Sequence, residues 1–503
     1  MQREQLAPTG TTSTTSSSAT EETPAARATK AAVTTLADWL PGWIELRRRM
    51  LRVPGVQVSI RVAGELLYSE AFGTADEERD VPLTTEHLFR IASHSKTFAA
   101  TACLILTERG ELRLDDTVAT WVPELADTDL AGVTVRALLG HQAGVIRDGA
   151  DSNYWQLIRD FPDSAGLLEA LHTNGSTFAT DQHFKYSNYG YSIVGLIVER
   201  VSGSTFNDFV RTEILDRLNL PRLYPDVDGI DPAELSAGHS LRLDGDDEQF
   251  VMRNPSTGAM SAATGFVACA DDLTAYASAH LPGDERLVSD AGKRLMQRTE
   301  SIVEVRGVEK GRYGLGLELH TLGKRKTFGH SGGFPGFITR TFVDPQDQLV
   351  ISVLTNQSGG PAHEIAVGVL AMIDLAVTAP AVGAEWPAVP DALEASSFTT
   401  RLAAGFGYLD IVDVGGRLAL LHPGMADPAS EAAYLEVVDA DTLTVLASAG
   451  YAVAGETVQL ERDGDGSIVA GTVAGMQAWP IETFLARRRT QMARSPEETP
   501  DGS

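Results

Sequence analysis

Short turns between strand-like segments are the feature that most restricts how this chain can fold. Val56–Val62 and Leu66–Phe72 are two such segments, with only a few residues between them. Phe337–Val343 and Leu349–Thr355 form a second pair, which flanks the turn sequence Asp344–Asp347. Strands joined by connections this short run antiparallel. The sequence therefore predicts an antiparallel sheet flanked by helices, which is an α+β fold and not a doubly wound parallel one.

A long block of helices and loops, from about Ser93 to Pro282, separates the two sets of strands. Phe98–Arg109 has helical character and is followed by Gly110, the residue type that most often closes a helix. The other elements that the pattern predicts are helices at Leu36–Leu51, Val194–Val201 and Ala362–Val377 and strands at Tyr313–His320 and Lys326–Gly329. The block is thus expected to form an all-helical subdomain beside the sheet.

Composition divides the chain into a large domain and a smaller one. The first segment is rich in Thr, Ser and Ala and shows no periodicity, which is typical of disorder. The last hundred residues alternate apolar and polar side chains between turn signals, which favours a small all-β domain, barrel or sandwich. The predicted division is a disordered tail at 1–35, the α+β domain at 36–378, a linker at 379–395, the all-β domain at 396–485 and a polar tail at 486–503.

Charge and apolar patterning restrict the partners and the location. The chain has 41 basic and 68 acidic residues and a net charge of −27, which argues against binding to nucleic acid or to an anionic membrane. Residues 1–30 lack the apolar core of a secretory signal. We find no apolar run of the ~20 residues that a membrane span needs. The sequence therefore predicts a cytoplasmic protein without a membrane partner.

The cysteines and histidines do not form a metal-binding pattern. Cys103 and Cys269 lie in separate apolar stretches and are expected to be reduced and buried. None of the 11 histidines belongs to an H-E-x-x-H motif; in His363-Glu364 the second histidine is replaced by Val367. We therefore expect neither a metal nor a cofactor.

The segment from Phe89 to Phe98 contains the spacing S-x-x-K, with Ser93 and Lys96. Residues three apart lie on one face of a helix, so a helix beginning near Ser93 brings the hydroxyl and the amine together. Such a serine can act as a nucleophile if the pKa of the lysine is depressed. A bare match of this length is also explained by a capping serine and a surface lysine.

Two further segments carry residues suited to the same chemistry. Tyr186 and Asn188 stand in a loop that precedes a predicted helix, and a tyrosine held near ammonium groups can act as a base. Gly329–Gly333 reads Gly-His-Ser-Gly-Gly and also satisfies G-x-S-x-G, the nucleophile elbow that would make Ser331 the nucleophile. An elbow needs a helix immediately after it, whereas a hairpin is predicted here, so Ser93 is the better candidate.

Together the three segments resemble the serine β-lactamase and penicillin-binding-protein superfamily, whose motifs include S-x-x-K and K-T-G. The Tyr-x-Asn form of the second motif is similar to the class C branch. Further similar stretches are Gly110–Asp116, Val135–Gly144, Ala263–Gly265 with Asp271–Leu273, Tyr313–Gly316 and Leu354–Asn356. The resemblance covers about residues 38–378 and implies the β-lactamase/transpeptidase-like fold.

The resemblance also implies roles for individual residues. Ser93 would attack a carbonyl, Lys96 and Tyr186 would share the acid and base work, and Asn188 would orient the substrate amide. The backbone N–H groups of Ser93 and Gly333 would form the oxyanion hole. The remaining residues of the third motif, His330, Ser331 and Gly332, would line the substrate site. Among the neighbours, His94 is expected to point away, Arg90 to anchor the loop and His141 to be structural.

The third motif differs from Lys-Thr-Gly because His330 stands in the place of the lysine. Histidine at this place is familiar in esterase, D-aminopeptidase and amidase members, and it could bind a carboxylate only when protonated. The first hypothesis is therefore a metal-independent serine hydrolase that cleaves an ester, amide or peptide bond in a small molecule or short peptide. The alternatives are a β-lactamase or D,D-carboxypeptidase and a non-catalytic penicillin-recognising module. In related enzymes such C-terminal domains pack on the catalytic domain, and some help to shape the cleft; a role of the all-β domain in stability or in homo-oligomerisation is equally open.

Overall fold

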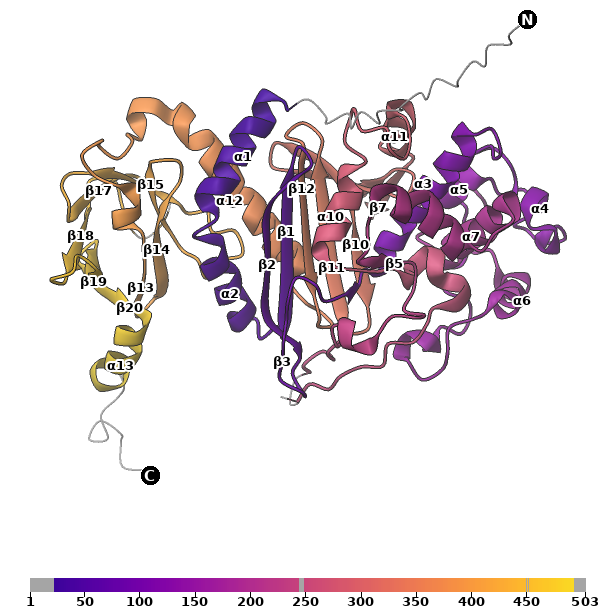
Figure 1. The fold of residues 1–503 in the computed structure, drawn as a ribbon, viewed down its shortest axis with the longest axis horizontal. Helices are drawn as coiled ribbons and strands as arrows, with labels where there is room; N and C mark the ends of the chain where they lie inside the picture. The colour runs from indigo at the N-terminus through magenta and orange to yellow at the C-terminus, as the bar shows by residue number, and fades with distance from the viewer. Residues whose placement is uncertain (1–21, 244–247, 449, 451, 493–503) are drawn as a thin grey trace, which may run out of the picture.

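The computed structural model describes residues 22–243, 248–448, 450 and 452–492. Its layers follow one another along the long axis of the molecule (Figure 1). The C-terminal barrel lies at one end, then helices α1 (Pro24–Leu36), α2 (Leu40–Met50) and α12 (Ala362–Val382), then the large sheet, and the helical block at the other end. The predicted α+β class, with a helical subdomain and a barrel, is confirmed.

The large sheet joins the two ends of the α+β domain. Its nine strands have the order β3-β2-β1-β12-β11-β10-β9-β8-β7. The strands are β1 (Gly55–Val62), β2 (Glu65–Asp76), β3 (Val81–Pro82), β7 (Ser301–Val305), β8 (Val308–Tyr313), β9 (Glu318–Leu322), β10 (Arg325–Phe334), β11 (Phe337–Asp344) and β12 (Leu349–Thr355). Every pairing is antiparallel, and β1 lies against β12 with Val56 opposite Thr355. Both predicted hairpins are therefore present.

The helical block packs on the far face of this sheet. Its helices are α3 (Ser95–Glu108), α4 (Val118–Trp121), α5 (Val135–Leu139), α6 (Ser164–Asn174), α7 (Asn188–Ser202), α8 (Phe206–Val210), α9 (Asp216–Leu218), α10 (Ala270–Ser278) and α11 (Asp290–Met296). A three-stranded sheet of β4 (Phe89–Arg90), β6 (Val267–Ala268) and β5 (Leu223–Tyr224) accompanies them. Nearly all of α3 is buried, so the helix that follows Ser93 is the centre of this core.

Helix α12 corrects the prediction that no apolar segment is long enough to cross a membrane. Ala362–Glu385 is long and apolar enough to cross a membrane, and an 18-residue stretch of it has a mean hydropathy of 2.1. More than half of that stretch is buried within the protein, because α12 packs on β11, β12 and α1. Gly368 lies so close to the Trp43 ring that a β-carbon there would be 2.4 Å from it. In this structure α12 is a core helix between sheet and barrel.

The C-terminal domain is a closed antiparallel barrel, one of the two architectures that the sequence predicted. Its eight strands are β13 (Thr400–Ala404), β14 (Gly407–Asp413), β15 (Leu418–Leu421), β16 (Ala433–Val437), β17 (Thr442–Ala447), β18 (Thr457–Arg462), β19 (Ile468–Val473) and β20 (Met476–Pro480), followed by α13 (Ile481–Met492). The Trp43 indole donates to the Pro423 carbonyl (3.1 Å), and Trp386 stacks on Tyr434. The barrel therefore shares a core with α2 and α12.

Four further sequence predictions are corrected. Disorder over residues 1–35 is wrong from Pro24 on, because α1 buries Ala26, Val33 and Leu36 against α12; residues 1–21 lie outside the described residues. The single helix predicted at 36–51 is interrupted between α1 and α2. The strand predicted at 313–320 is two strands, since β8 ends at Tyr313 and β9 begins at Glu318. The predicted linker also begins as helix, because α12 continues to Val382.

Candidate active site

Ser93 lies in a single 3-10 turn, η1 (Ala92–His94), that leads directly into α3. Ala92 has a φ of +47°, a left-handed conformation that is costly for a residue with a β-carbon and typical of constrained sites. The turn leaves Ser93 half-buried while Lys96 is completely buried. Lys96 Nζ donates to Ser93 Oγ at 3.2 Å, so the predicted proximity of the two side chains is present.

The Lys96 amine is held by two further acceptors. Nζ donates to Asn188 Oδ1 and to the Ala263 carbonyl, each at 2.8 Å. Ala263 belongs to a π-helical turn, η7 (Ser261–Gly265), an irregularity often found at functional sites. Burial lowers the pKa of Lys96 to about 7; Asp148 opposes this change and Arg147 adds to it. A large fraction of Lys96 is therefore neutral at neutral pH and able to accept a proton.

The Tyr186 hydroxyl donates to Ser93 Oγ at 2.7 Å. Lys96 Nζ lies 4.7 Å from the centre of the Tyr186 ring, within the range of a cation–π contact. Burial raises the pKa of Tyr186 well above its ordinary value, although its hydrogen bond to Ser93 lowers it. The expectation that nearby ammonium groups pull this phenol toward phenolate is therefore wrong for the resting site, in which Lys96 is the stronger candidate for the base.

Asn188 is the first residue of α7, and its position is fixed from both sides. The preceding Ser187 caps the helix by accepting from the Gly190 N–H. Asn188 Nδ2 donates to Asp148 Oδ1 at 2.7 Å, which turns the amide oxygen toward Lys96. Asp148 carries no signal in the sequence, because it is buried and follows the exposed Arg147 in a loop without a motif.

The third motif lies on β10 directly beside the Ser93 turn. A β-carbon on Gly332 would be 2.2 Å from the Ile91 carbonyl oxygen, so only glycine lets the strand approach the turn this closely. Residues 325–329 of β10 pair with β9, whereas Phe328–Phe334 pair with β11. From His330 on, β10 has no second partner strand among the residues the structure describes. Gly333 is exposed on this segment.

His330 is buried and neutral. Its Nδ1 lies 2.7 Å from the Ser331 carbonyl, which can only accept, so Nδ1 carries the proton. Nε2 then accepts from the Tyr313 hydroxyl at 2.9 Å. Burial lowers the pKa of His330 to about 4, with Glu318 opposing the change. His330 therefore supplies no positive charge at neutral pH.

A cluster of charged residues that the sequence analysis missed lies beside Ser331. Glu318 on β9 accepts from Ser331 Oγ at 2.7 Å, and its other oxygen binds Arg340 and His320. Burial would raise the pKa of Glu318, but His320, Arg340 and His330, the last once it is protonated at low pH, hold it well below its ordinary value. A carboxylate is therefore bound directly to the Ser331 hydroxyl of the third motif.

Several neighbours have structural contacts, as the sequence predicted. His94 faces the sheet and contacts the Ile91 carbonyl and Thr341 Oγ1, each at 2.9 Å. Arg90 is buried and pairs with Asp226 at 2.8 Å, which anchors the loop. Ser331 lies within a strand that turns into the β11 hairpin, so the nucleophile-elbow geometry is not present at this serine.

His141 has a structural contact as well, because its Nδ1 accepts from the Ser187 N–H at 3.2 Å, and its ring lies 4.4 Å from that of Tyr186. Cys103 and Cys269 are free and buried. Within the described parts of the chain, no group of three or more potential metal ligands occurs.

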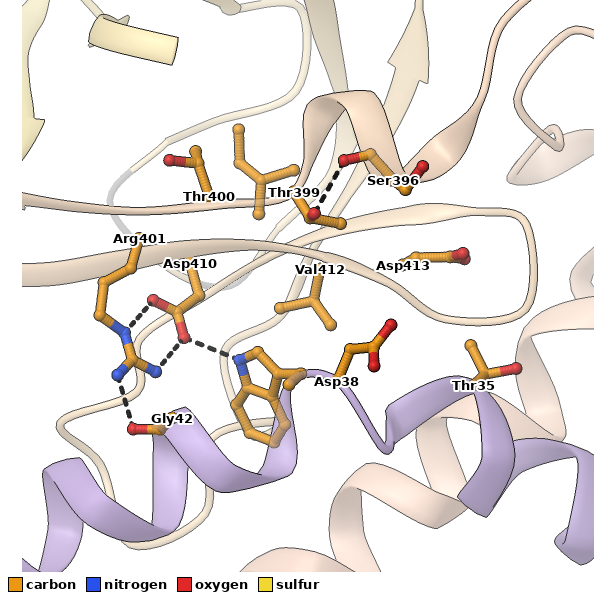
Figure 2. A pocket seen from close by; sticks show the side chains of 12 residues that line it. Thr35, Asp38, Gly42, Ser396, Thr399, Thr400, Arg401, Asp410, Val412 and Asp413 are labelled. Carbon is orange, nitrogen blue, oxygen red and sulfur yellow. Dashed lines mark hydrogen bonds and ion pairs between the residues drawn. The ribbon is translucent and has the colours of Figure 1, made fainter. Parts of the chain in front are cut away.

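A cavity of about 330 Å³ lies elsewhere, between α1, α2 and the barrel (Figure 2). Arg401 binds Asp410 with two hydrogen bonds of 2.7 and 2.6 Å and donates to the Gly42 carbonyl. The Trp39 indole donates to the same carboxylate at 2.7 Å. None of the residues that line this cavity contacts Ser93, Lys96 or Tyr186, so the cavity joins the two domains and is separate from the Ser93 site.

Comparison with known proteins identifies the family. The family model described as "Beta-lactamase" matches residues 8–371. This chain belongs to the beta-lactamase family. Penicillin-binding protein 4* of Bacillus subtilis is 27% identical over 324 residues, which cover 60% of this chain and 68% of the relative. Esterase EstB of Burkholderia gladioli is 36% identical over 183 residues, 34% of this chain and 46% of that esterase. The resemblance stated from the motifs is confirmed.

Solved structures share the fold of this beta-lactamase family member. The octameric penicillin-binding protein homologue from Pyrococcus abyssi aligns with a TM-score of 0.59 at 22% identity and covers 88% of this chain and 99% of its own. SurE aligns with a TM-score of 0.56 at 23% identity, and the match covers 91% of this chain and 100% of SurE. D-amino acid amidase from Ochrobactrum anthropi has a TM-score of 0.58 at 24% identity, and the match covers 67% of this chain and 98% of the amidase. The first two likenesses extend over most of the chain.

Proposed function

We propose that this protein is a serine hydrolase that forms an acyl-enzyme on Ser93 and cleaves an ester or amide bond, as an esterase, amidase or D-aminopeptidase does. The observation that carries the proposal is the convergence of Lys96 and Tyr186 on one oxygen, at 3.2 and 2.7 Å from Ser93 Oγ. Family membership and similarity to an esterase support it. The substrate is a small molecule or a short peptide.

In the proposed reaction Lys96 begins as the neutral amine, which its lowered pKa makes available. As Ser93 Oγ attacks the carbonyl, its proton passes to Lys96, directly or through the Tyr186 hydroxyl that already contacts Oγ. The backbone N–H groups of Ser93 and Gly333 stabilise the oxyanion. Tyr186 donates a proton to the leaving group and receives one back from Lys96. Water then attacks the acyl-enzyme by the reverse proton route and releases the acid.

Asn188 fits a supporting role in this scheme. Its amide oxygen holds Lys96 and its nitrogen is bound to Asp148, so the site keeps one orientation of the amine. Hydrolysis of a β-lactam or a D,D-peptide is the second candidate, because a relative is named penicillin-binding protein 4*. The neutral His330 argues against it, since those substrates carry a carboxylate.

The nucleophile is tested by intact-mass spectrometry after treatment with a fluorophosphonate. We expect one adduct on the wild-type protein and none on Ser93→Ala, together with hydrolysis of p-nitrophenyl butyrate by the wild type alone. An adduct that persists in Ser93→Ala refutes the assignment. A protein that forms no adduct and turns over no ester is instead the non-catalytic penicillin-recognising module. Nitrocefin as the best substrate would reverse the order of the two enzymatic candidates.

Cytoplasmic location, the lack of nucleic-acid and membrane partners and homo-oligomerisation stay predictions from the sequence. Light scattering on the purified protein measures the number of copies.

A further inference from the structure

We propose that Glu318 makes the site selective for the charge of its substrate. The site prefers an acyl substrate with a protonated amine beside Ser331 and disfavours one with a carboxylate there. This inference rests on the acyl-enzyme function proposed above and names its substrate class.

Strand register places the charged cluster on one face of the sheet. Ser331 is opposite Arg340 across β10 and β11, and Gly329 is opposite Glu318 across β10 and β9. Opposite residues of antiparallel strands share a face, and so do residues two apart on one strand. Glu318, Ser331 and Arg340 therefore point the same way. His330 Nδ1 also lies 3.6 Å from Glu318 Oε1, and its Nε2 contacts Tyr313, which is opposite Glu318 across β8 and β9.

The Ser331 hydroxyl is left with acceptor capacity only. Its proton is directed to Glu318 Oε1 at 2.7 Å, so its lone pairs remain for a ligand. A ligand group at this place must then bring its own N–H or O–H donor. An ammonium group does so, whereas a carboxylate would face an oxygen that offers no proton and a second carboxylate behind it.

The Glu318 side chain is also more exposed than that of Arg340, the cation that binds it. The exposed fraction is 21%, compared with 11% for the Arg340 guanidinium that binds its other oxygen. Its charge acts on the centre of the site, because Glu318 contributes to raising the pKa of both Lys96 and Tyr186. The exposed cation near Tyr186, Arg147, is bound to Asp148 instead. A substrate group beside Ser331 therefore meets a negative charge.

The test compares three substrates that carry an ammonium group, an uncharged amide or a carboxylate at the amino end. They are the p-nitroanilides of alanine, N-acetylalanine and N-succinylalanine, each as the D and the L form, assayed below the amine pKa of ~7.7–8.0. We expect the wild type to have its highest kcat/KM with the ammonium substrate and its lowest with the carboxylate. In Glu318→Gln the ratio of these two values should fall by about 10-fold or more, mainly through KM. If an anilide is not turned over, its inhibition constant against p-nitrophenyl butyrate gives the same comparison.

Two variants separate charge from structure. Glu309→Gln, on the exposed strand β8 and paired with Arg312, removes the same charge at a distance and should leave the ratio unchanged. Ser331→Ala keeps the carboxylate and should retain most of the discrimination. The inference is overturned if Glu318→Gln lowers kcat/KM equally for all three substrates, or if the wild type has its highest kcat/KM with the carboxylate substrate. Failure of the wild type to hydrolyse p-nitrophenyl butyrate is a different outcome, because it contradicts the proposed function itself.

Discussion

The Asp148→Asn substitution tests how the protein sets the basicity of Lys96. Two hydrogen bonds in series through the Asn188 amide, of 2.7 and 2.8 Å, put the Asp148 carboxylate roughly 7 Å from the Lys96 amine. At that distance and an effective dielectric constant of about 20, Coulomb's law gives roughly 2 kcal/mol, or between one and two pH units. Asparagine keeps an acceptor for Asn188, so the change removes charge and leaves the hydrogen bond.

The sign of the effect follows from the role of Lys96 as a base. Activity appears as the pH rises through the pKa of Lys96, which is about 7 in the wild type. Loss of the negative charge disfavours the ammonium form, and Arg147, freed from Asp148, acts in the same direction. The acidic limb of kcat/KM should therefore move to lower pH by about one to two units.

The assay is the pH profile of kcat/KM for p-nitrophenyl butyrate, a substrate without charge of its own. Asp151→Asn is the matched control, because Asp151 lies on the same loop but is 53% exposed and pairs with Arg159. We expect its profile to coincide with that of the wild type. A limb that stays in place in Asp148→Asn, or that moves to higher pH, refutes the assignment of this limb to Lys96.

Three further substitutions test the rest of the architecture. Tyr186→Phe should lower kcat for p-nitrophenyl butyrate by about 10²–10⁴-fold, since it removes the proton carrier, while fluorophosphonate adducts still form slowly on Ser93. Gly332→Ala should abolish turnover and lower the free energy of unfolding by about 1–3 kcal/mol, because its β-carbon would lie 2.2 Å from the Ile91 oxygen; urea unfolding measures this. Asp410→Ala should cost roughly 2–4 kcal/mol in the same assay, because Arg401 loses its carboxylate partner and the Trp39 indole N–H loses its acceptor, and an unchanged midpoint would contradict this.

The sequence was most informative where a pattern is local. The S-x-x-K spacing predicted the contact of Ser93 and Lys96, because residues three apart lie on the same face of a helix. Strand alternation and the turn at Asp344–Asp347 predicted β12 to the residue. The family resemblance added Tyr186, whose contact with Ser93 spans 93 residues of sequence and has no local signal of its own.

The residues that were missed owe their places to tertiary structure. Asp148 reaches the site because the loop before α6 lies over the start of α7, with the Asn188 N–H bound to the Arg147 carbonyl. Glu318 was hidden inside a predicted strand at 313–320. Gly316 has a φ of +73°, and a β-carbon on Gly314 would be 2.1 Å from the Met296 oxygen, so the chain turns there and β9 starts at Glu318. Single-residue patterns do not reveal such a turn.

The two missed carboxylates also link substrate charge to the strength of the base. Asp148 and Glu318 both raise the pKa of Lys96, against the burial that lowers it to about 7. A bound ammonium substrate would lower that pKa further, which leaves more neutral amine, whereas a bound carboxylate would raise it and keep Lys96 protonated. The acidic limb of kcat, which reports the enzyme–substrate complex, should therefore lie at lower pH for alanine p-nitroanilide than for N-succinylalanine p-nitroanilide. Coincident limbs for the two substrates would show that the charge beside Ser331 does not reach Lys96.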